Sequence, residues 1–345
     1  MGLRILYVGE PSGTCAQRRR AFEALGHQVH FVLAGEPAGG LQRQIYRLGH
    51  HLSRPPDLLA THAGVEQAVQ RQHFDVLWMD KGRTLKPSLL RSVRQRLPDI
   101  EMVSYSPDDM TLPYHSSVRY RACLPLLDLI VTTKSYIAGE LKDLGARRVL
   151  FIGNAYEPDV HRPVVLTHEE RERFGCEVGF IGTYEEDRAG HLLQLAEAGV
   201  PVTVRGYGWR RFEGRHPRLQ ILEGHLGQED YVKVINATGI NLGFLRKGAR
   251  DQQTTRSVEI PGCRGFLLAE RTEEHEGLFR EGEEAEFFAS FEELLRKCRR
   301  YLADPEARER VAAGGFERCQ RDGYSNQARL EWVLAELAAP TARGG

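Results

Sequence analysis

From Arg250 to Glu270 the sequence reads RDQQTTRSVEIPGCRGFLLAE, and this stretch predicts a helix start, a glycine-rich turn and an apolar strand in succession. Thr254 and Thr255 stand where the helix would begin. Their hydroxyls and free backbone N–H groups would lie at the positive end of the helix dipole, where a phosphate is stabilised without a metal. The stretch therefore predicts a diphosphate-binding segment between a helix start and a strand.

Two carboxylates, Asp251 and Glu259, lie on either side of the predicted helix start. Glu259 can accept two hydrogen bonds from a vicinal diol such as a ribose. We expect both acids to bind hydroxyl groups of a ligand. The alternative for Glu259 is a buried helix acid that is satisfied by a neighbouring turn.

The composition is that of a globular protein with a large core. Of the 345 residues, 41% are apolar and 27% charged, and this length favours two domains. Lysine plus arginine equal aspartate plus glutamate at 47 each, so no overall charge favours nucleic acid or an anionic membrane. No apolar stretch approaches membrane-spanning length, and we expect no integral membrane segment.

The cysteines follow no metal-binding or disulfide pattern. They are scattered, without CxxC or Cys/His ligand spacing, which predicts reduced thiols, a cytoplasmic location and no metal site. The six are Cys15, Cys123, Cys176, Cys263, Cys298 and Cys319.

Short apolar runs alternate with amphipathic stretches through both halves, as a parallel sheet covered by helices requires. The runs predict strands at Arg4–Val8, Gln28–Val32, Val76–Trp78, Glu101–Tyr105, Leu129–Thr132 and Val149–Ile152, and then at Val178–Ile181, Val202–Arg205, Leu219–Leu222, Ile240–Leu245 and Gly265–Leu268. The first helix of the second half is predicted at His191–Ala198. This α/β pattern indicates two Rossmann-like, doubly wound domains in tandem.

We predict the following domain limits. Residues 1–155 form an N-terminal Rossmann-like domain, and 156–165 a linker with two prolines. Residues 166–324 form a second Rossmann-like domain. Residues 325–338 form a C-terminal helix that packs back on the first domain.

Several segments occur in the order found in the CgeB-like (spore-maturation-type) group 1 glycosyltransferases, which the chain resembles over nearly its whole length. They are Ser106–Met110, Thr132–Tyr136, Asn154–Tyr156, Phe180–Arg188, Val204–Trp209, Arg250–Pro261 and Glu270–Phe279. The resemblance implies the GT-B fold, in which two Rossmann-like domains face a cleft and a helical tail ends the chain. It also implies that residues 1–155 bind the acceptor and that residues 166–324 bind a nucleotide-sugar donor, with a UDP-sugar favoured and no cofactor.

In that family an acid-x7-acid pattern places its first acid near the donor sugar and its second on the ribose. These positions are Asp251, where the family usually has glutamate, and Glu259. The resemblance implies a nucleotide-sugar site that also includes Gly182, Thr183, Arg188, Gly206, Gly208, His225, Leu226, Thr254, Thr255 and Arg256. Family members often have Arg and Lys at the positions of Thr183 and Arg188, so Arg256 or Arg246 would replace one positive charge.

The first half offers a second set of polar residues after its predicted strands. Asp108 and Asp109 follow the strand at Glu101–Tyr105, at the sheet edge where ligands of doubly wound folds bind. One of them would act as a base on an acceptor hydroxyl or accept its hydrogen bond. Lys81 would be their counter-ion or contact the substrate. Gly13 and Lys134 complete the acceptor or phosphate side, although a Gly after a strand is more often a plain turn and a helix cap explains Lys134 equally well.

The function these features predict is metal-independent transfer of a sugar from a nucleoside diphosphate sugar to an acceptor hydroxyl, on a glycan or small molecule. Retention is implied by the acid-x7-acid pattern, and inversion with Asp108 or Asp109 as base is the alternative. A nucleotide-sugar epimerase of the same fold and a non-catalytic coat or scaffold protein are the other candidates. An oxidoreductase is disfavoured because Gly9–Gly13 is not GxGxxG.

Overall fold

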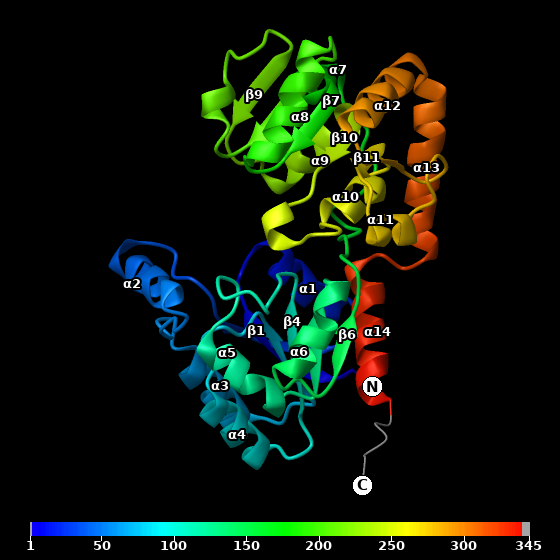
Figure 1. Cartoon of the computed structure of the whole chain (residues 1–345). Helices are drawn as coiled ribbons and strands as arrows, with labels where there is room; N and C mark the ends of the chain where they lie inside the picture. The colour runs from blue at the N-terminus through cyan, green and yellow to red at the C-terminus, as the bar shows by residue number, and fades with distance from the viewer. Residues whose placement is uncertain (1, 340–345) are drawn as a thin grey trace. The chain divides into compact units, whose positions relative to one another are not determined.

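The computed structural model describes residues 2–339, which divide into two compact units (Figure 1). The first unit is built from residues 2–153 together with 326–339, and the second from residues 154–325. Each unit contains one six-stranded sheet in which all pairs of neighbouring strands are parallel.

The sheet of the first unit has the strand order β2-β1-β3-β4-β5-β6. Its elements are β1 (Arg4–Gly9), α1 (Gly13–Ala24), β2 (Gln28–Leu33), α2 (Gly40–His51), α3 (Thr61–Arg71), β3 (Val76–Asp80), α4 (Pro87–Arg96), β4 (Glu101–Ser106), α5 (Val118–Cys123), η1 (Leu124–Leu126), β5 (Leu129–Thr132), η2 (Ser135–Ile137), α6 (Ala138–Asp143), β6 (Val149–Phe151) and α14 (Asn326–Ala338).

Helices cover both faces of this sheet, which explains why its central strands are continuous apolar runs rather than alternating ones. Every residue of β3 is buried. One core layer joins the sheet to α3, α4, α5 and α6, and the other joins it to α1 and α14. Helix α14 therefore belongs to the first unit although it follows the second unit in sequence.

The sheet of the second unit has the order β12-β11-β10-β7-β8-β9. Its elements are α7 (His168–Phe174), β7 (Cys176–Ile181), α8 (Glu186–Glu197), β8 (Val202–Gly206), η3 (Arg210–Phe212), β9 (Leu219–Glu223), α9 (Gln228–Ala237), β10 (Thr238–Gly243), η4 (Lys247–Ala249), α10 (Arg256–Gly262), β11 (Leu267–Glu270), α11 (Glu273–Leu278), β12 (Glu286–Phe288), α12 (Phe291–Ala303) and α13 (Pro305–Arg321). Helices α8 and α12 pack in one core layer, and α9, α10 and α11 in the other.

The residues expected to form a linker, 156–165, lie within the second unit. Tyr156 is 1% exposed, and its hydroxyl accepts a hydrogen bond from Nε2 of Gln320 at 2.7 Å. The main chain of Tyr156 also pairs with Tyr324 and bridges to Ser325. This segment is therefore fixed to the C-terminal end of the second unit by its own side chain and backbone.

Candidate functional site

The carboxyl ends of parallel strands meet at one edge of a sheet, and this is where ligands bind in doubly wound folds. In the second unit this edge is formed by the loops that follow β7, β8, β10 and β11 and by the start of α10. The acid-x7-acid segment lies between β10 and β11, in the centre of this edge.

Glu259 lies on α10 with both carboxylate oxygens close to a neighbouring side chain. It is 7% exposed. The hydroxyl of Tyr231 on α9 donates to Oε2 at 2.6 Å, and Nε2 of His161 lies 3.6 Å from Oε1. Nδ1 of His161 accepts from the backbone N–H of Glu157 at 3.0 Å, which places the ring proton on Nε2, toward Glu259.

Burial dominates the protonation of these two neighbours. It raises the pKa of Tyr231 well above its ordinary value, and the Glu259 carboxylate adds to the effect. It also lowers the pKa of His161, although Glu259 acts in the opposite direction. A neutral tyrosine and a neutral histidine therefore orient the Glu259 carboxylate, while each of its oxygens keeps a further lone pair for a ligand.

The loop before α10 is held in place from several sides. Oε1 of Gln253 accepts from the backbone and side-chain N–H groups of Asn154 at 2.9 and 3.2 Å, and its Nε2 donates to Glu274 at 2.7 Å. The Asp251 side chain is 4% exposed, with Oδ2 3.6 Å from Nε of Arg246. The two acids of the pattern thus lie on a fixed loop and a short helix.

Three arginines come together at the same edge. Arg188 is 3% exposed, and its Nη atoms donate to the carbonyls of Thr183 and Leu245 at 3.3 and 3.2 Å, linking the loops after β7 and β10. Burial lowers the pKa of Arg188, and the nearby charges of Arg256 and Arg246 lower it further against the attraction of acidic neighbours. The sequence prediction started α8 five residues too late, so Arg188 lies in its first turn rather than in a loop.

The Nε atoms of Arg188 and Arg256 are buried and have no hydrogen-bond partner within residues 2–339. Arg256 also lowers the pKa of Tyr231 against the larger effect of burial, so its charge lies close to the Tyr231–Glu259 pair. Arg256 therefore lies near both Arg188 and Glu259. An anion bound at this edge would meet the positive charge of these arginines.

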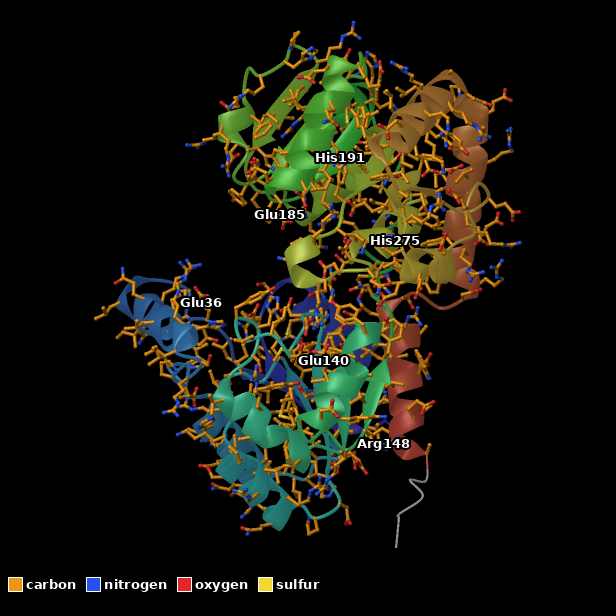
Figure 2. All side chains as sticks on the ribbon, viewed as in Figure 1. Glu36, Glu140, Arg148, Glu185, His191 and His275 are labelled. Atoms are coloured by element: carbon orange, nitrogen blue, oxygen red, sulfur yellow. The ribbon has the colours of Figure 1, made fainter. Side chains whose placement is uncertain are left out.

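One expectation about the helix start is wrong. The backbone N–H of Thr254 is not free, because it donates to Oγ of Ser257 at 3.0 Å. That Oγ lies 2.7 Å from Nε2 of His275, whose Nδ1 lies 2.6 Å from the carbonyl of Glu270. Thr255 has helical backbone angles and makes no side-chain cap. The Ser257–His275 pair (His275 is labelled in Figure 2) thus fixes the helix start to β11.

The glycines predicted to contact the nucleotide also have structural roles in the fold. A Cβ on Gly206 would lie 2.0 Å from the carbonyl oxygen of Gly182, and φ of Gly206 is +151°. That carbonyl accepts from Nε1 of Trp209 at 2.8 Å, and the N–H of Gly208 donates to Glu223 at 2.8 Å. These contacts bring the β7 and β8 loops together at the sheet edge.

His225 and Leu226 lie in the short loop between β9 and α9, with His225 exposed. The structure therefore places every nucleotide-site residue of the sequence prediction at or beside the carboxyl edge of one sheet. The loop of His225 and Leu226 follows β9, the last strand at that side of the sheet.

The first unit has a cavity of about 260 Å³ at the carboxyl edge of β1, β2 and β3. Gly13 and Lys81 line it, with Glu10, Tyr46 and Thr84 among the other lining residues. Gly13 (φ +64°) has no atom within 4 Å of an added Cβ. The cavity is near the lower end of small-molecule pockets, roughly 300 Å³.

A buried ion pair forms one wall of this cavity. Arg18 donates to both oxygens of Asp80 at 3.0 and 2.8 Å, and the Tyr7 hydroxyl donates to Oδ2 at 2.5 Å. The guanidinium carbon of Arg18 lies 4.1 Å from the centre of the Tyr105 ring. Burial, reinforced by Asp80, raises the pKa of Cys15 to about 12. This thiol therefore stays protonated at neutral pH.

The paired acids after β4 have separate environments. Asp108 lies 2.9 Å from Nζ of Lys81. Although burial acts to raise its pKa, Lys81 with His115 and Arg83 holds the pKa of Asp108 below its ordinary value. Asp109 is 1% exposed, and its Oδ1 accepts from the N–H and hydroxyl of Thr111 at 3.0 and 2.6 Å. Lys134 is buried, and its N–H donates to Oγ1 of Thr132 at 3.1 Å.

Sequence reasoning missed four residues of these sites, Tyr231, His161, Arg18 and Asp80. Tyr231 and His161 precede Glu259 by 28 and 98 positions, and no local spacing joins them. Arg18 begins a run of three consecutive arginines, a pattern typical of an exposed helix face, yet it is 5% exposed. Asp80 could have been identified from the sequence, because it is an acid at the end of a strand.

The two doubly wound units define the GT-B fold, and this prediction is confirmed by solved structures. The chain is similar to sucrose-phosphate synthase from Thermosynechococcus elongatus, with 13% identity, a TM-score of 0.69 and coverage of 98% of this chain and 100% of that chain. It is similar to Anabaena Alr3699/HepE in complex with UDP and glucose, with 15% identity, a TM-score of 0.63 and coverage of 98% and 100%.

A third similar structure, from Listeria monocytogenes, is assigned as a UDP-N-acetylglucosamine 2-epimerase, with 11% identity, a TM-score of 0.60 and coverage of 98% of this chain and 96% of that chain. Residues 188–335 match the family model described as glycosyl transferase-like. No match is found among curated protein sequences. The family model thus covers most of the second unit and most of α14, and the similar structures share the GT-B fold.

Within residues 2–339 no three His, Cys, Asp or Glu side chains are grouped so that they could hold a metal ion. No helix in that part is long and apolar enough to cross a membrane. All six cysteines carry free thiols.

Proposed function

We propose that the protein transfers a sugar from a nucleoside diphosphate sugar, with a UDP-sugar favoured, to an acceptor hydroxyl, and that it does so without a metal in the manner of the CgeB-like glycosyltransferases. The observation that carries the proposal is the placement of the Glu259–Tyr231 pair near the charge of Arg256, which in turn lies near Arg188. A diol-binding acid next to a set of cations matches the ribose and diphosphate of such a donor.

Within this proposal each group of the site has one task. Glu259 accepts hydrogen bonds from the ribose hydroxyls, and Asp251 from a hydroxyl of the donor sugar. The backbone near Gly182, Thr183, Gly206 and Gly208 borders the nucleotide, and His225 and Leu226 lie on the side of the base. Thr254 and Thr255 would contact the diphosphate through their hydroxyls.

The arginines carry the electrostatic part of the mechanism. Breaking the bond between sugar and diphosphate leaves negative charge on the departing phosphate oxygen. Arg188 and Arg256 would stabilise that charge, and Arg246 would add to their field. Because these cations are fixed by the fold before the reaction, they need little reorganisation as the charge develops.

We further propose that the reaction retains the configuration of the sugar, with the acceptor attacking from the face that the phosphate leaves. The lowered pKa of Asp108 supports this, since it makes that carboxylate a weaker base. The occupied Oδ1 of Asp109 supports it as well. In this scheme Asp108, Lys81 and Gly13 belong to the acceptor side, and Lys134 to the acceptor or phosphate side.

The test is calorimetric titration of wild type and of Glu259→Gln with UDP, GDP, ADP and TDP in the presence of EDTA. The change to glutamine keeps an acceptor for Tyr231 while removing the charge. We expect one nucleotide to bind wild type, and Glu259→Gln to bind it roughly tenfold more weakly. The exposed Glu177, which lies near the start of β7 rather than at its carboxyl end, gives the matched control Glu177→Gln with unchanged binding.

Equal affinity of wild type and Glu259→Gln would remove the ribose assignment. A complete absence of nucleotide binding would instead favour the non-catalytic scaffold. An epimerase remains a second candidate because one similar structure is so assigned. Incubation of the protein with UDP-N-acetylglucosamine in the absence of an acceptor distinguishes it, since only an epimerase would then interconvert the sugar.

A further inference from the structure

Helix α2 carries a stripe of exposed aliphatic side chains. Leu41 is 71% exposed, Ile45 45%, Leu48 64% and Leu52, at the C-terminal cap, 68%. Positions spaced by four, three and four residues fall on one face of a helix. Single exposed aliphatic residues are ordinary, but a continuous stripe marks an interaction surface.

The helix is fixed to the first unit by its other side, so the stripe points outward. Tyr46 is its one buried residue and lines the cavity of that unit. Nε of Arg43 and Nε of Arg47 lie 2.5 and 2.8 Å from Oε1 of Glu36. Figure 1 shows α2 at the margin of the first unit, and the labelled Glu36 in Figure 2 lies beside it.

The charge around this stripe differs from that of the whole chain. Residues 36–56 include three arginines, two histidines and one acid, Glu36, which pairs with Arg43 and Arg47, so the segment keeps a net positive charge whereas the complete chain has a formal net charge of zero. Arg43 and Arg47 are 46% and 58% exposed. A helix with an aliphatic face and a cationic polar face is typical of segments that lie in the plane of an anionic membrane surface.

We propose that α2 docks the protein on an anionic phospholipid surface, with its axis parallel to the membrane and its aliphatic stripe inserted among the acyl chains. A second copy of the chain fits this surface less well. A stable dimer needs roughly 20 residues from each partner. Two α2 helices packed face to face would offer four large apolar residues each and would bring their arginines together.

The experiment is sedimentation of the full-length protein with phosphatidylcholine vesicles and with vesicles of phosphatidylcholine and phosphatidylglycerol at 3:1. We expect wild type to bind the anionic vesicles, and the double variant Leu41→Gln/Leu48→Gln to bind about tenfold more weakly or not at all. The variant Arg43→Gln/Arg47→Gln, which loses two positive charges, should bind the anionic vesicles a few-fold more weakly. Val165→Gln changes an aliphatic residue that is 98% exposed outside this stripe, and it should bind like wild type.

Each further outcome has a defined meaning. Failure of wild type to bind anionic vesicles overturns the proposal, as does equal binding by the Leu41→Gln/Leu48→Gln variant. A wild-type dimer in light scattering that this variant converts to a monomer assigns the stripe to a second copy and also overturns it. Because the changed side chains are exposed, unchanged thermal unfolding of the variants is the check on folding.

Discussion

At the residue scale, Glu259 shows what a spacing can and cannot predict. The sequence places an acid one turn after a helix start, and the structure has it there on α10. Its two contacts come from Tyr231 and His161, which are distant in sequence. Glu259 is therefore buried and bonded, but by two distant side chains rather than by a neighbouring turn, and ligand binding through its remaining lone pairs stays a prediction.

We predict that Tyr231→Phe weakens nucleotide binding without removing it. The variant loses the 2.6 Å hydrogen bond that fixes Oε2 of Glu259, so the carboxylate must be ordered when the ligand binds. One hydrogen bond of this kind corresponds to about a three- to tenfold higher Kd, measured by calorimetric titration with UDP.

Tyr301→Phe is the matched control for Tyr231→Phe. The Tyr301 hydroxyl is likewise bonded to a buried acid, Glu286, in the same unit. The Tyr301→Phe variant should lower the unfolding temperature and leave the Kd for the nucleotide unchanged. If both variants bind UDP with the wild-type affinity, Tyr231 has no positioning role and its bond is structural.

At the scale of elements, the close approach of the loops after β7 and β8 requires glycine at position 206. An added Cβ there would meet a backbone carbonyl at 2.0 Å, at a φ of +151° that suits only glycine. We predict that Gly206→Ala destabilises the second unit by more than about 2 kcal/mol. Scanning calorimetry measures the loss.

Gly214→Ala provides the comparison, because Gly214 also has positive φ (+71°) but has open space around it. Its cost should be limited to the backbone strain, about 1 kcal/mol. Equal losses for the two variants would show that the contact with the Gly182 carbonyl is not what requires glycine at position 206.

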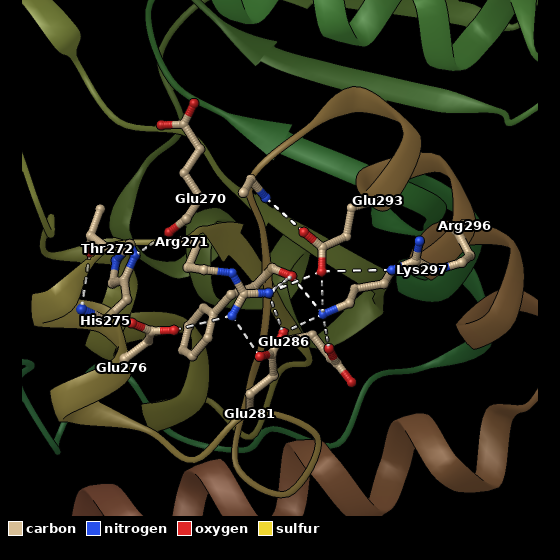
Figure 3. A network of polar contacts seen from close by, with 12 residues as sticks. Glu270, Arg271, Thr272, His275, Glu276, Glu281, Glu286, Glu293, Arg296 and Lys297 are labelled. Atoms are coloured by element: carbon tan, nitrogen blue, oxygen red, sulfur yellow. Dashed lines mark hydrogen bonds and ion pairs between the residues drawn. The ribbon is translucent and has the colours of Figure 1, made fainter.

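A second element-scale feature is the ion network between β11, β12 and α12 (Figure 3). Arg271 bonds both oxygens of Glu281 at 2.6 and 2.7 Å, and Lys297 reaches Glu281 and Glu286. Hydrogen bonds from Arg271 lower the pKa of Glu281 to about 2, and Lys297 adds to this against the effect of burial.

The sign of the pH dependence follows from that shift. A carboxylate with a lower pKa in the folded state stabilises the fold above its unfolded pKa and stops doing so as the pH falls through its folded pKa. We therefore expect the unfolding temperature of the second unit to fall between pH 4.5 and about 2, with a shallower slope in Glu281→Gln. Calorimetric scans at several pH values test this, and identical slopes would exclude Glu281 as a contributor.

How far the elements could be predicted depends on their length and burial. Long apolar strands such as β1 and β3 were predicted from their sequence because they are buried on both faces. The three-residue β12 was missed because it has the sequence Glu-Phe-Phe, with a buried acid that only its ion network explains. Short helices such as α11 have too few turns for a visible period.

At the scale of the whole molecule, the two sheets could be predicted from the repeated strand–helix alternation, because each sheet is built almost entirely of consecutive units. The side-chain contacts of the site could not. The pairs Arg18–Asp80 and Tyr231–Glu259 join elements whose sequence separation exceeds any local pattern. Such contacts depend on the order of strands in the sheet.

One element does not follow this consecutive order. Helix α14 belongs to the first unit although it comes after the whole second unit in the sequence. Three of its side chains are buried in the core layer between the sheet and α1: Leu330, Val333 and Leu337, at 1%, 0% and 7% exposed. Nη2 of Arg148 donates to the carbonyl of Glu336 at 2.6 Å. On this face of the sheet the core layer is completed by α1 and α14, so the first unit depends on the last helix of the chain for part of its core.

We predict that truncation after Ser325 destabilises the first unit and spares the second. Each of the three aliphatic side chains contributes about 1.5–3 kcal/mol by burial, and their sum is comparable to the stability of a whole domain. Limited proteolysis read by mass spectrometry should find new cleavage sites within residues 2–153 and none within 154–325. Val333→Asp should reproduce this pattern, whereas Ala335→Asp, at an exposed position of the same helix, should not. Cleavage spread equally over both units would mean that α14 stabilises the chain as a whole rather than the sheet it covers.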